Sequence, residues 1–212
     1  AVPASIVSIG DYAFGDCDSL KDVTVSEGTT SIGVCAFAYC DSLETVSLPA
    51  SVTVIDAGAF MDCSSLTNVD LLESELVIGQ DAFCGCSSLA DIQLPQGTVS
   101  IGEYAFDGCS ADLRLSCFST SSVYTQVVDS YENVNTIYPV SNVELNKLSA
   151  EMYVGDTLQL DALITPLNAT DKSVVWSTNQ PTIATVDENG LVTAISGGTA
   201  IISVMTNDNK FI

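Results

Sequence analysis

The chain has 212 residues, enough for two modest domains, and its 47% hydrophobic content against 15% charged residues excludes global disorder. Its 27 acidic and 5 basic residues give a net charge of −22, which disfavours nucleic acid and anionic lipid as partners and would suit calcium or a basic protein surface better. The sequence contains no histidine, which excludes Ser-His-Asp and Cys-His catalysis and imidazole metal sites, and it has no apolar run near the ~20 residues that membrane insertion needs.

An Ala-Phe dipeptide recurs at a spacing of 23 residues, at 13–14, 36–37, 59–60, 82–83 and 105–106. A cysteine follows each copy at the same distance, at Cys17, Cys40, Cys63, Cys86 and Cys109. Sequence similarity that recurs at a fixed period, with no insertion or deletion between copies, indicates that each unit is one turn of a solenoid. The spacing therefore predicts five stacked units over residues 1–117.

Each unit also contains the pattern Leu-x-x-Val-x-Val/Leu, which predicts a short strand with its apolar side inward. Stacked units then form a parallel sheet with one strand per turn. The Ala-Phe segment on the opposite side of the turn is expected to be a short helical or 3-10 turn. Five apolar columns, each repeating every 23 residues, are expected in the core, and they begin at Val7, Ile9, Leu20, Val23 and Val25.

The full pattern, Leu-x-x-Val-x-Leu-Pro…Ile-Gly-x-x-Ala-Phe-x-x-Cys, resembles the BspA-like leucine-rich repeat of bacterial surface proteins over about residues 5–117. The resemblance implies a curved solenoid whose strands line a concave face used for binding rather than catalysis. The fifth unit departs from the pattern, because Asp112 stands where leucine belongs and Cys117 replaces the last aliphatic residue of the strand. A terminal unit, at which stacking stops, is expected to differ in this way.

Residues 118–140 are expected to cap the C-terminal end of the solenoid with a helix and a strand. The Thr-Ser-Ser segment at 120–122 offers a helix N-cap, and apolar residues follow at helical spacing between Val123 and Tyr131. The alternating segment from Val134 to Tyr138 then predicts one more strand.

All eight cysteines lie in the first 117 residues, and five of them share the repeat phase. Adjacent coils place cysteines of one column about 5 Å apart, so spacing alone does not forbid disulfides. Free buried thiols are the favoured interpretation, because free cysteine packs as a small hydrophobic residue. Cys84-Gly85-Cys86 does not have the Cys-x-x-Cys spacing of redox or zinc sites.

Residues 141–212 consist of short alternating runs separated by turns, which predicts an antiparallel sandwich. Asn189-Gly190 is a strong tight-turn signal, and Trp176 is expected to anchor the core. Segments such as Tyr153-Val-Gly-Asp-Thr and Val174-Val-Trp-Ser-Thr-Asn resemble the group 2 bacterial immunoglobulin-like domain, whose modules serve as spacers or display units. The pattern would begin its closing strand at Phe211-Ile212, so we expect a truncated piece of a longer native protein with one sheet edge open.

The outward positions of the predicted repeat strands are the best binding candidates. They form two polar rows expected on the concave side. The rows comprise Asp22, Thr24, Thr45, Ser47, Asn68, Asp70, Asp91 and Gln93, with Arg114 and Ser116 continuing them. The alternative is that these residues are only the solvated face of a sheet, as the acidic surface in general can be. The rows lack aromatic residues, which argues against a tight sugar platform.

No residue is assigned a catalytic or metal-binding role, and no cofactor is expected. Calcium is the one metal considered, at acidic turns such as Asp16-Cys-Asp18 and Asp62, but no complete calcium-loop motif supports it. Tuned acid–base catalysis needs a carboxyl group desolvated in a cleft, and a solenoid of small repeats offers no obvious cleft.

Two resemblances to surface-protein modules on one chain indicate a non-catalytic protein of the bacterial cell surface or extracellular space. The expected function is adhesion or protein–protein interaction through the concave face of the solenoid. The expected partner is a surface protein or glycan of a host or neighbouring cell. The alternative is an accessory binding or spacer segment of a larger surface enzyme, with catalysis elsewhere in the native chain.

Overall fold

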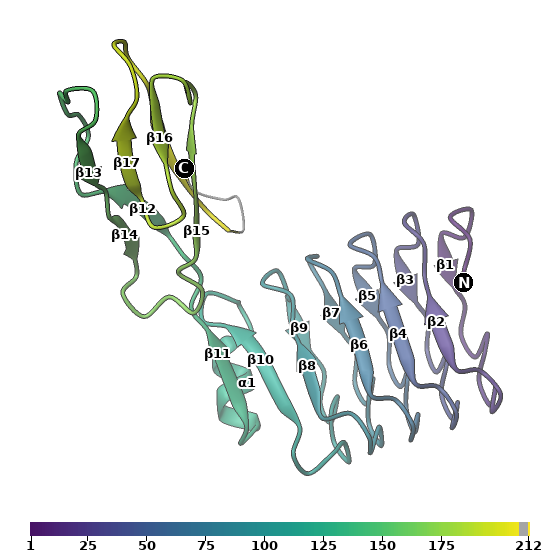
Figure 1. Cartoon of the computed structure of the whole chain (residues 1–212). Helices are drawn as coiled ribbons and strands as arrows, with labels where there is room; N and C mark the ends of the chain where they lie inside the picture. Colours follow the sequence, from purple (N-terminus) through teal and green to yellow (C-terminus); the bar gives the residue numbers. More distant parts are fainter. Residues whose placement is uncertain (208–211) are drawn as a thin grey trace. The chain divides into compact units, whose positions relative to one another are not determined.

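The computed structural model describes residues 1–207 and 212, which form two units, Ala1–Ile137 and Tyr138–Ile212. The first unit is a parallel β-solenoid and the second is an antiparallel β-structure (Figure 1). The predicted parallel solenoid followed by an all-β antiparallel unit is confirmed.

Each turn of the solenoid contributes two strands, so the prediction of one strand per turn is wrong. The missed strands are only two residues long and form a five-stranded parallel sheet. They are β1 (Ser8–Ile9), β3 (Ser31–Ile32), β5 (Val54–Ile55), β7 (Val77–Ile78) and β9 (Ser100–Ile101). A two-residue strand is too short to show alternation in the sequence, which is why the pattern did not reveal it.

The strands that the sequence predicts lie along another side of the solenoid, in two three-stranded parallel sheets (Figure 1). The first sheet contains β2 (Asp22–Thr24), β4 (Thr45–Leu48) and β6 (Asn68–Leu71). The second contains β8 (Asp91–Gln93), β10 (Arg114–Phe118) and β11 (Val134–Ile137). From β2 to β6 the register is 23 residues, since Val23 pairs with Val46 and Val46 with Val69.

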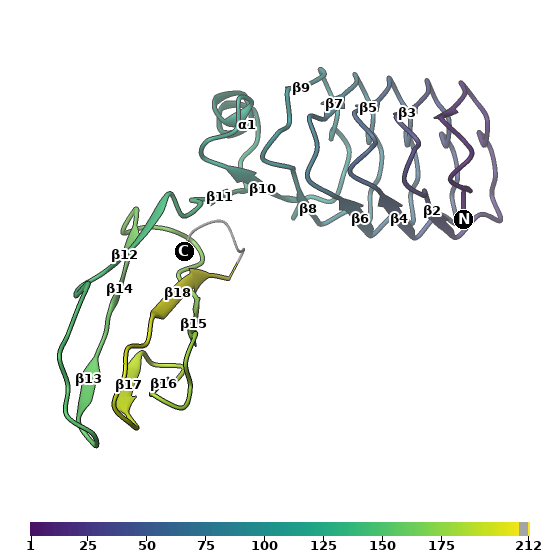
Figure 2. The same ribbon diagram turned by 90° about the horizontal axis from the view of Figure 1, so that it is seen from above.

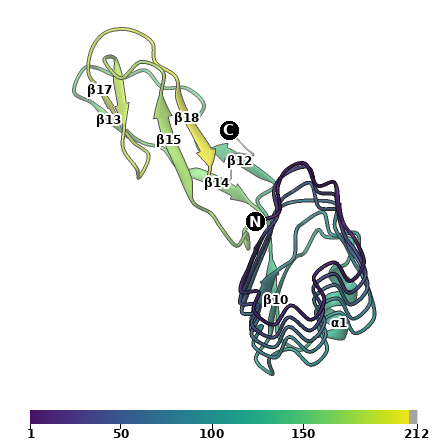
Figure 3. The same ribbon diagram turned by 90° about the vertical axis from the view of Figure 1, so that its right-hand side faces the viewer.

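The phenylalanines of the repeat form one straight stack inside the solenoid. Consecutive rings from Phe14 to Phe106 lie 5.1 to 5.5 Å apart between centroids, with interplanar angles of 1° to 7°. Viewed along the stack, the turns superpose on one another (Figure 3). The 23-residue period therefore places equivalent side chains in aligned columns, as predicted.

Four of the five expected apolar columns lie inside the solenoid, and one does not. In the column that begins at Val7, Val7 and Val99 are 65% and 52% exposed, and only Leu76 is buried. The buried position is one residue earlier, at Thr29, Val52 and Thr98. This position lies just before each two-residue strand begins, so the inward–outward alternation of the strand does not extend back to it.

The Ala-Phe segments are turns, so the expectation of a helical or 3-10 segment is wrong. Each turn contains two residues with positive φ, four positions apart, and a right-handed helix cannot include them. The first column of such residues is Tyr12, Cys35, Gly58, Asp81 and Tyr104. The second column is Asp16, Tyr39, Asp62, Gly85 and Gly108.

After the fifth unit, α1 (Tyr124–Ser130) and β11 lie at the C-terminal end of the stack (Figure 2). The ring of Tyr131 packs edge-on against Phe106, with 5.9 Å between centroids, and covers the end of the phenylalanine stack. The 120–122 segment is not the expected N-cap, because Val123 holds that position without a side-chain bond. The hydroxyl of Ser122 instead donates to the carbonyl oxygen of Thr98 in the preceding coil, at 2.8 Å.

The described residues of the second unit contain seven strands, all paired antiparallel. They are β12 (Asn142–Leu145), β13 (Thr157–Gln159), β14 (Ala162–Thr165), β15 (Val174–Thr178), β16 (Ala184–Val186), β17 (Leu191–Ala194) and β18 (Ile202–Thr206). The sheets pair β12 with β14, β15 with β18, and the central strand β17 with both β13 and β16. Gly190 has φ 82°, and a Cβ there would lie 2.7 Å from the ring of Trp176, so the turn needs glycine.

One edge of β12 and one edge of β18 have no partner strand in the part of the chain that the structure describes. The start of the closing strand, expected at Phe211-Ile212, falls mostly outside the described residues, because 208–211 are not among them.

Candidate binding surface

The eight candidate residues lie on the outward face of β2, β4, β6 and β8, and we call them the polar strip. In each of these strands the central residue is buried and its neighbours point outward, as in the order exposed–buried–exposed of β2 and β8. Six of the eight side chains are exposed, whereas Thr45 and Ser47 are half-buried. The structure therefore brings all eight residues together on one side of the solenoid.

Polar contacts between coils order part of the strip. The Thr45 hydroxyl donates a 2.6 Å hydrogen bond to the Asp22 carboxylate in the coil before it. Arg114 Nη1 lies 4.0 Å from the Asp91 carboxylate, in an exposed ion pair. Within the described part of the chain, the Asp70 side chain has neither a hydrogen bond nor an ion pair, so its carboxylate is the most available acceptor of the strip.

Arg114 and Ser116, which continue the two polar rows, differ in solvent exposure. Arg114 is exposed and borders an open hollow of about 610 Å³, which Asp112, Glu132 and Asn135 also line. Ser116 is buried and accepts a 3.0 Å hydrogen bond from the amide of Asn135 on β11. The sequence did not reveal that the cap strand would cover the end of the second row, because that requires the pairing of β11 with β10.

A second exposed surface was missed by sequence reasoning. Tyr12, Tyr39 and Tyr104 occupy positive-φ positions of the Ala-Phe turns and are 68%, 45% and 62% exposed. We call the face formed by these turns the tyrosine edge. The available signal was the phase of Gly58, Gly85 and Gly108, which mark the same two columns.

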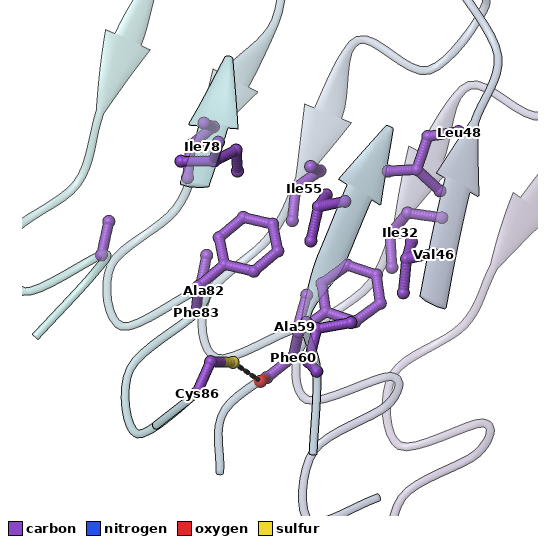
Figure 4. Close-up of a cluster of buried hydrophobic side chains, with 14 of the residues drawn as sticks. Ile32, Val46, Leu48, Ile55, Ala59, Phe60, Ile78, Ala82, Phe83 and Cys86 are labelled. Carbon is purple, nitrogen blue, oxygen red and sulfur yellow. Dashed lines mark hydrogen bonds between the residues drawn. The ribbon is translucent and has the colours of Figure 1, made fainter. Parts of the chain in front are cut away.

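The cysteines are structural. All eight are free thiols, and Cys40, Cys63 and Cys86 are fully buried. Each of these three donates a 3.1 Å hydrogen bond to a phenylalanine carbonyl oxygen in the preceding coil, as Figure 4 shows for Cys86 and Phe60. The favoured interpretation of the repeat-phased cysteines is thus confirmed for these three residues.

Burial makes these thiols poor nucleophiles, because the reactive form is the thiolate. Burial raises the pKa of Cys40 to about 11 and that of Cys109 to about 12. The thiol of Cys84 is half-buried, and burial followed by the charges of Asp81 and Asp107 raises its pKa as well.

In residues 1–207 and 212, no group of three or more carboxylates and thiols is arranged to hold a metal ion. The acidic turns considered for calcium, at Asp16, Asp18 and Asp62, do not form such a group. No helix in this part of the chain is long and apolar enough to cross a membrane.

Comparison with known proteins finds relatives among bacterial proteins. An uncharacterized protein of Clostridium acetobutylicum is 41% identical over 88 residues, which cover 41% of this chain and 22% of that protein. A 3-O-alpha-D-galactosyl-alpha-L-arabinofuranosidase of Bifidobacterium longum subsp. longum is 43% identical over 54 residues, covering 26% of this chain and 5% of the enzyme. The chain therefore spans only a small part of the length of these relatives.

Among solved structures, a leucine rich repeat protein of T. pallidum is similar, with 35% identity and a TM-score of 0.49. The match covers 53% of this chain and 51% of that one. Residues 139–211 match the bacterial Ig-like domain (group 2). The BspA type leucine rich repeat region matches residues 1–112 and 74–149, more than half of the sequence, and the chain therefore belongs to the BspA type leucine-rich-repeat family.

Proposed function

We propose that this chain is a non-catalytic binding segment of a secreted or surface-attached bacterial protein. The solenoid provides the contact surface, and the immunoglobulin-like unit acts as a spacer or display unit. The partner is a surface protein or glycan of a host or neighbouring cell, so the biological outcome is adhesion. The observation that carries the proposal is the polar strip, an ordered row of outward side chains with a rigid buried core behind it.

The physical advantage of the strip is preorganisation. Val23, Val46 and Ile92 hold the strands from below and are at most 5% exposed, and the parallel hydrogen bonds set a spacing of about 4.8 Å between coils. A partner that meets such a surface orders few side chains on binding, which lowers the entropic cost of association.

The chemistry of the strip favours hydrogen-bond donors. Asp22, Asp70 and Asp91 supply carboxylate acceptors, while Thr24 and Gln93 can both donate and accept. Protein amides and ammonium groups, and glycan hydroxyls, all fit this description. The strip carries no aromatic residue, so we expect modest affinity at a single site and stronger attachment when several copies bind together.

The test is binding of the purified chain to immobilised mucin and matrix proteins. The triple variant Asp22→Ala, Asp70→Ala, Asp91→Ala should lose most of the binding of the unaltered chain. Its matched control is Glu27→Ala, Glu151→Ala, Glu188→Ala, which removes the same charge from three exposed positions elsewhere. Equal binding by the two triple variants would show that the polar strip is not the contact surface.

A second candidate is an accessory segment of a larger surface enzyme. The similarity to a part of the Bifidobacterium longum enzyme favours it, because that protein combines such a segment with a catalytic activity. The sequence of the complete native polypeptide decides between the two candidates. A catalytic domain in the same polypeptide would favour the accessory role, and further binding modules alone would favour the adhesin.

A further inference from the structure

The tyrosine edge has a composition that the fold does not require. At the ten positive-φ positions of the edge, glycine occurs at Gly58, Gly85 and Gly108, and side-chain-bearing residues occupy the other seven. A residue with a Cβ is disfavoured there by roughly 1–2 kcal/mol, so on backbone grounds alone glycine is the favoured residue. Tyrosine is a still less usual occupant than aspartate or asparagine.

The tyrosines remain accessible to a partner. Tyr12 and Tyr104 keep 68% and 62% of their surface exposed, and Tyr39 keeps 45%. Backbone strain at accessible positions often marks a surface with a role in binding. Exposed tyrosine is also one of the residue types that dominate the energetics of protein interfaces.

The negative charge of the tyrosine edge favours a cationic partner. The five turn segments that form it, residues 10–18, 33–41, 56–64, 79–87 and 102–110, contain nine acidic residues and no basic residue. The polar strip differs, because Lys21 and Arg114 lie next to it and pair with Glu44 and Asp91. An uncompensated acidic surface attracts a cationic partner and repels an anionic one.

The arrangement around Tyr39 fits a cationic side chain. Asp16 and Asp62 are its neighbours in the second positive-φ column, one coil before and one coil after, about 4.8 Å away along the stack. A guanidinium group placed over the ring would gain a cation–π contact, and the exposed Asp16 carboxylate one coil earlier could accept its N–H groups.

Tyr12 extends this arrangement in the first coil. The thiol of Cys35 lies close enough to Tyr12 to raise the pKa of its phenol, and Asp11 and Tyr39 act in the same direction more weakly. In the columns of positive-φ residues, Cys35 follows Tyr12 one coil later, and Tyr39 stands four residues after Cys35.

We propose that the tyrosine edge docks an arginine-rich segment of another protein, with Tyr12 and Tyr39 contacting guanidinium groups. This surface is distinct from the polar strip, so the chain would hold a second partner while the strip is occupied. Arginine is favoured over lysine because its planar group stacks on an aromatic ring and pairs with carboxylates at the same time.

The test uses a ten-residue peptide of alternating arginine and glycine as the probe, in calorimetric titrations of the full chain at 0.15 M salt. The double variant Tyr12→Gly, Tyr39→Gly should bind the peptide about fivefold to thirtyfold more weakly, from two exposed cation–π contacts. Its net charge is unchanged, so non-specific attraction to the acidic chain remains. Both variants place glycine where Gly58 and Gly85 already occur in the same columns, and thermal unfolding checks that the fold persists.

The matched control is Tyr153→Ala, which removes an 86% exposed tyrosine from the second unit and should change peptide affinity by less than twofold. Equal affinity for the unaltered chain and the double variant would overturn the proposal, as would an equal loss in the control. A tyrosine-dependent interaction with a galacto-oligosaccharide, without one with the peptide, would also overturn it and identify the edge as a glycan surface. Because the polar-strip variants keep both tyrosines, failure of either proposal leaves the other unaffected.

Discussion

The Sγ atom of Cys63 donates a 3.1 Å hydrogen bond to the carbonyl oxygen of Phe37, 26 residues earlier in the chain. The same bond joins Cys40 to Phe14 and Cys86 to Phe60, again at 3.1 Å. Each cysteine thus bonds to the coil before its own and fills the small space beside the phenylalanine stack. The repeat needs a residue at this position that is both small and able to donate.

Replacement of Cys63 by alanine should destabilise the solenoid by about 1–2 kcal/mol, because a buried acceptor loses its donor and a small void remains. The half-buried Cys84 provides the control, and Cys84→Ala should cost less than about 0.5 kcal/mol. Urea unfolding followed by circular dichroism measures both values. Equal costs would mean that the inter-coil bond contributes nothing.

Thiol reactivity should follow burial. In the native protein at pH 8, a disulfide reagent such as Ellman's reagent should modify the half-buried Cys35 long before Cys40, Cys63 and Cys86, which are 0% exposed. All eight thiols should react after unfolding in denaturant. Mass spectrometry of the labelled peptides gives the order, and rapid native labelling of Cys63 would contradict the buried ladder.

The stability of the solenoid should fall at alkaline pH. The pKa of Cys40 is about 11 in the folded state against 9.0 for an ordinary thiol, so the folded state favours the protonated form. The contribution of Cys40 is therefore complete below about pH 9 and is lost as the pH rises toward 11. Urea midpoints from pH 7 to 11 should decline less steeply in Cys40→Ala than in the unaltered chain, and parallel curves would rule out the effect.

Position in the stack should decide the cost of losing a phenylalanine. Phe60 is 0% exposed between Phe37 and Phe83, and Phe60→Ala should cost about 3–5 kcal/mol. Phe14 is 38% exposed at the first coil, so Phe14→Ala should cost less than half as much. Denaturant unfolding of the two variants tests this, and similar costs would argue against a continuous internal stack.

Glycine at position 39 should be tolerated better than alanine, in contrast to most positions. Tyr39 has φ 62°, and glycine adopts this conformation without the steric cost of a Cβ. Tyr39→Gly should therefore be about 1 kcal/mol more stable than Tyr39→Ala, which removes the same ring and keeps the Cβ. Thermal unfolding at neutral pH measures the difference, and an alanine variant equal to the glycine variant would exclude backbone strain.

The columns of the core show that the 23-residue period predicts which side chains are buried. Ile32, Ile55 and Ile78 share one phase and are all at most 1% exposed, because coils of equal length repeat every contact without slipping. The prediction for the column that begins at Val7 was wrong for a local reason, since Val7 lies just before the two-residue strand Ser8–Ile9 and outside its alternation. The polar strip could be predicted because an alternating strand with one buried face leaves its other residues outward.

The tyrosine edge shows where the sequence was insufficient. Tyr12 and Tyr39 belong to different columns, and nothing in their residue types marks them as positive-φ positions. Glycine, which signals such a conformation, is present in only part of each column.

The amino-acid sequence alone determined the solenoid, its 23-residue period, its buried phenylalanine and cysteine columns and the second all-β unit, because these depend on which residue types repeat at which spacing. Tertiary structure alone decided the second strand in each turn, the covering of Ser116 by the cap and the exposure of the tyrosines. These features depend on the local direction of the backbone between repeated positions, which hydrogen bonds to the neighbouring coils impose.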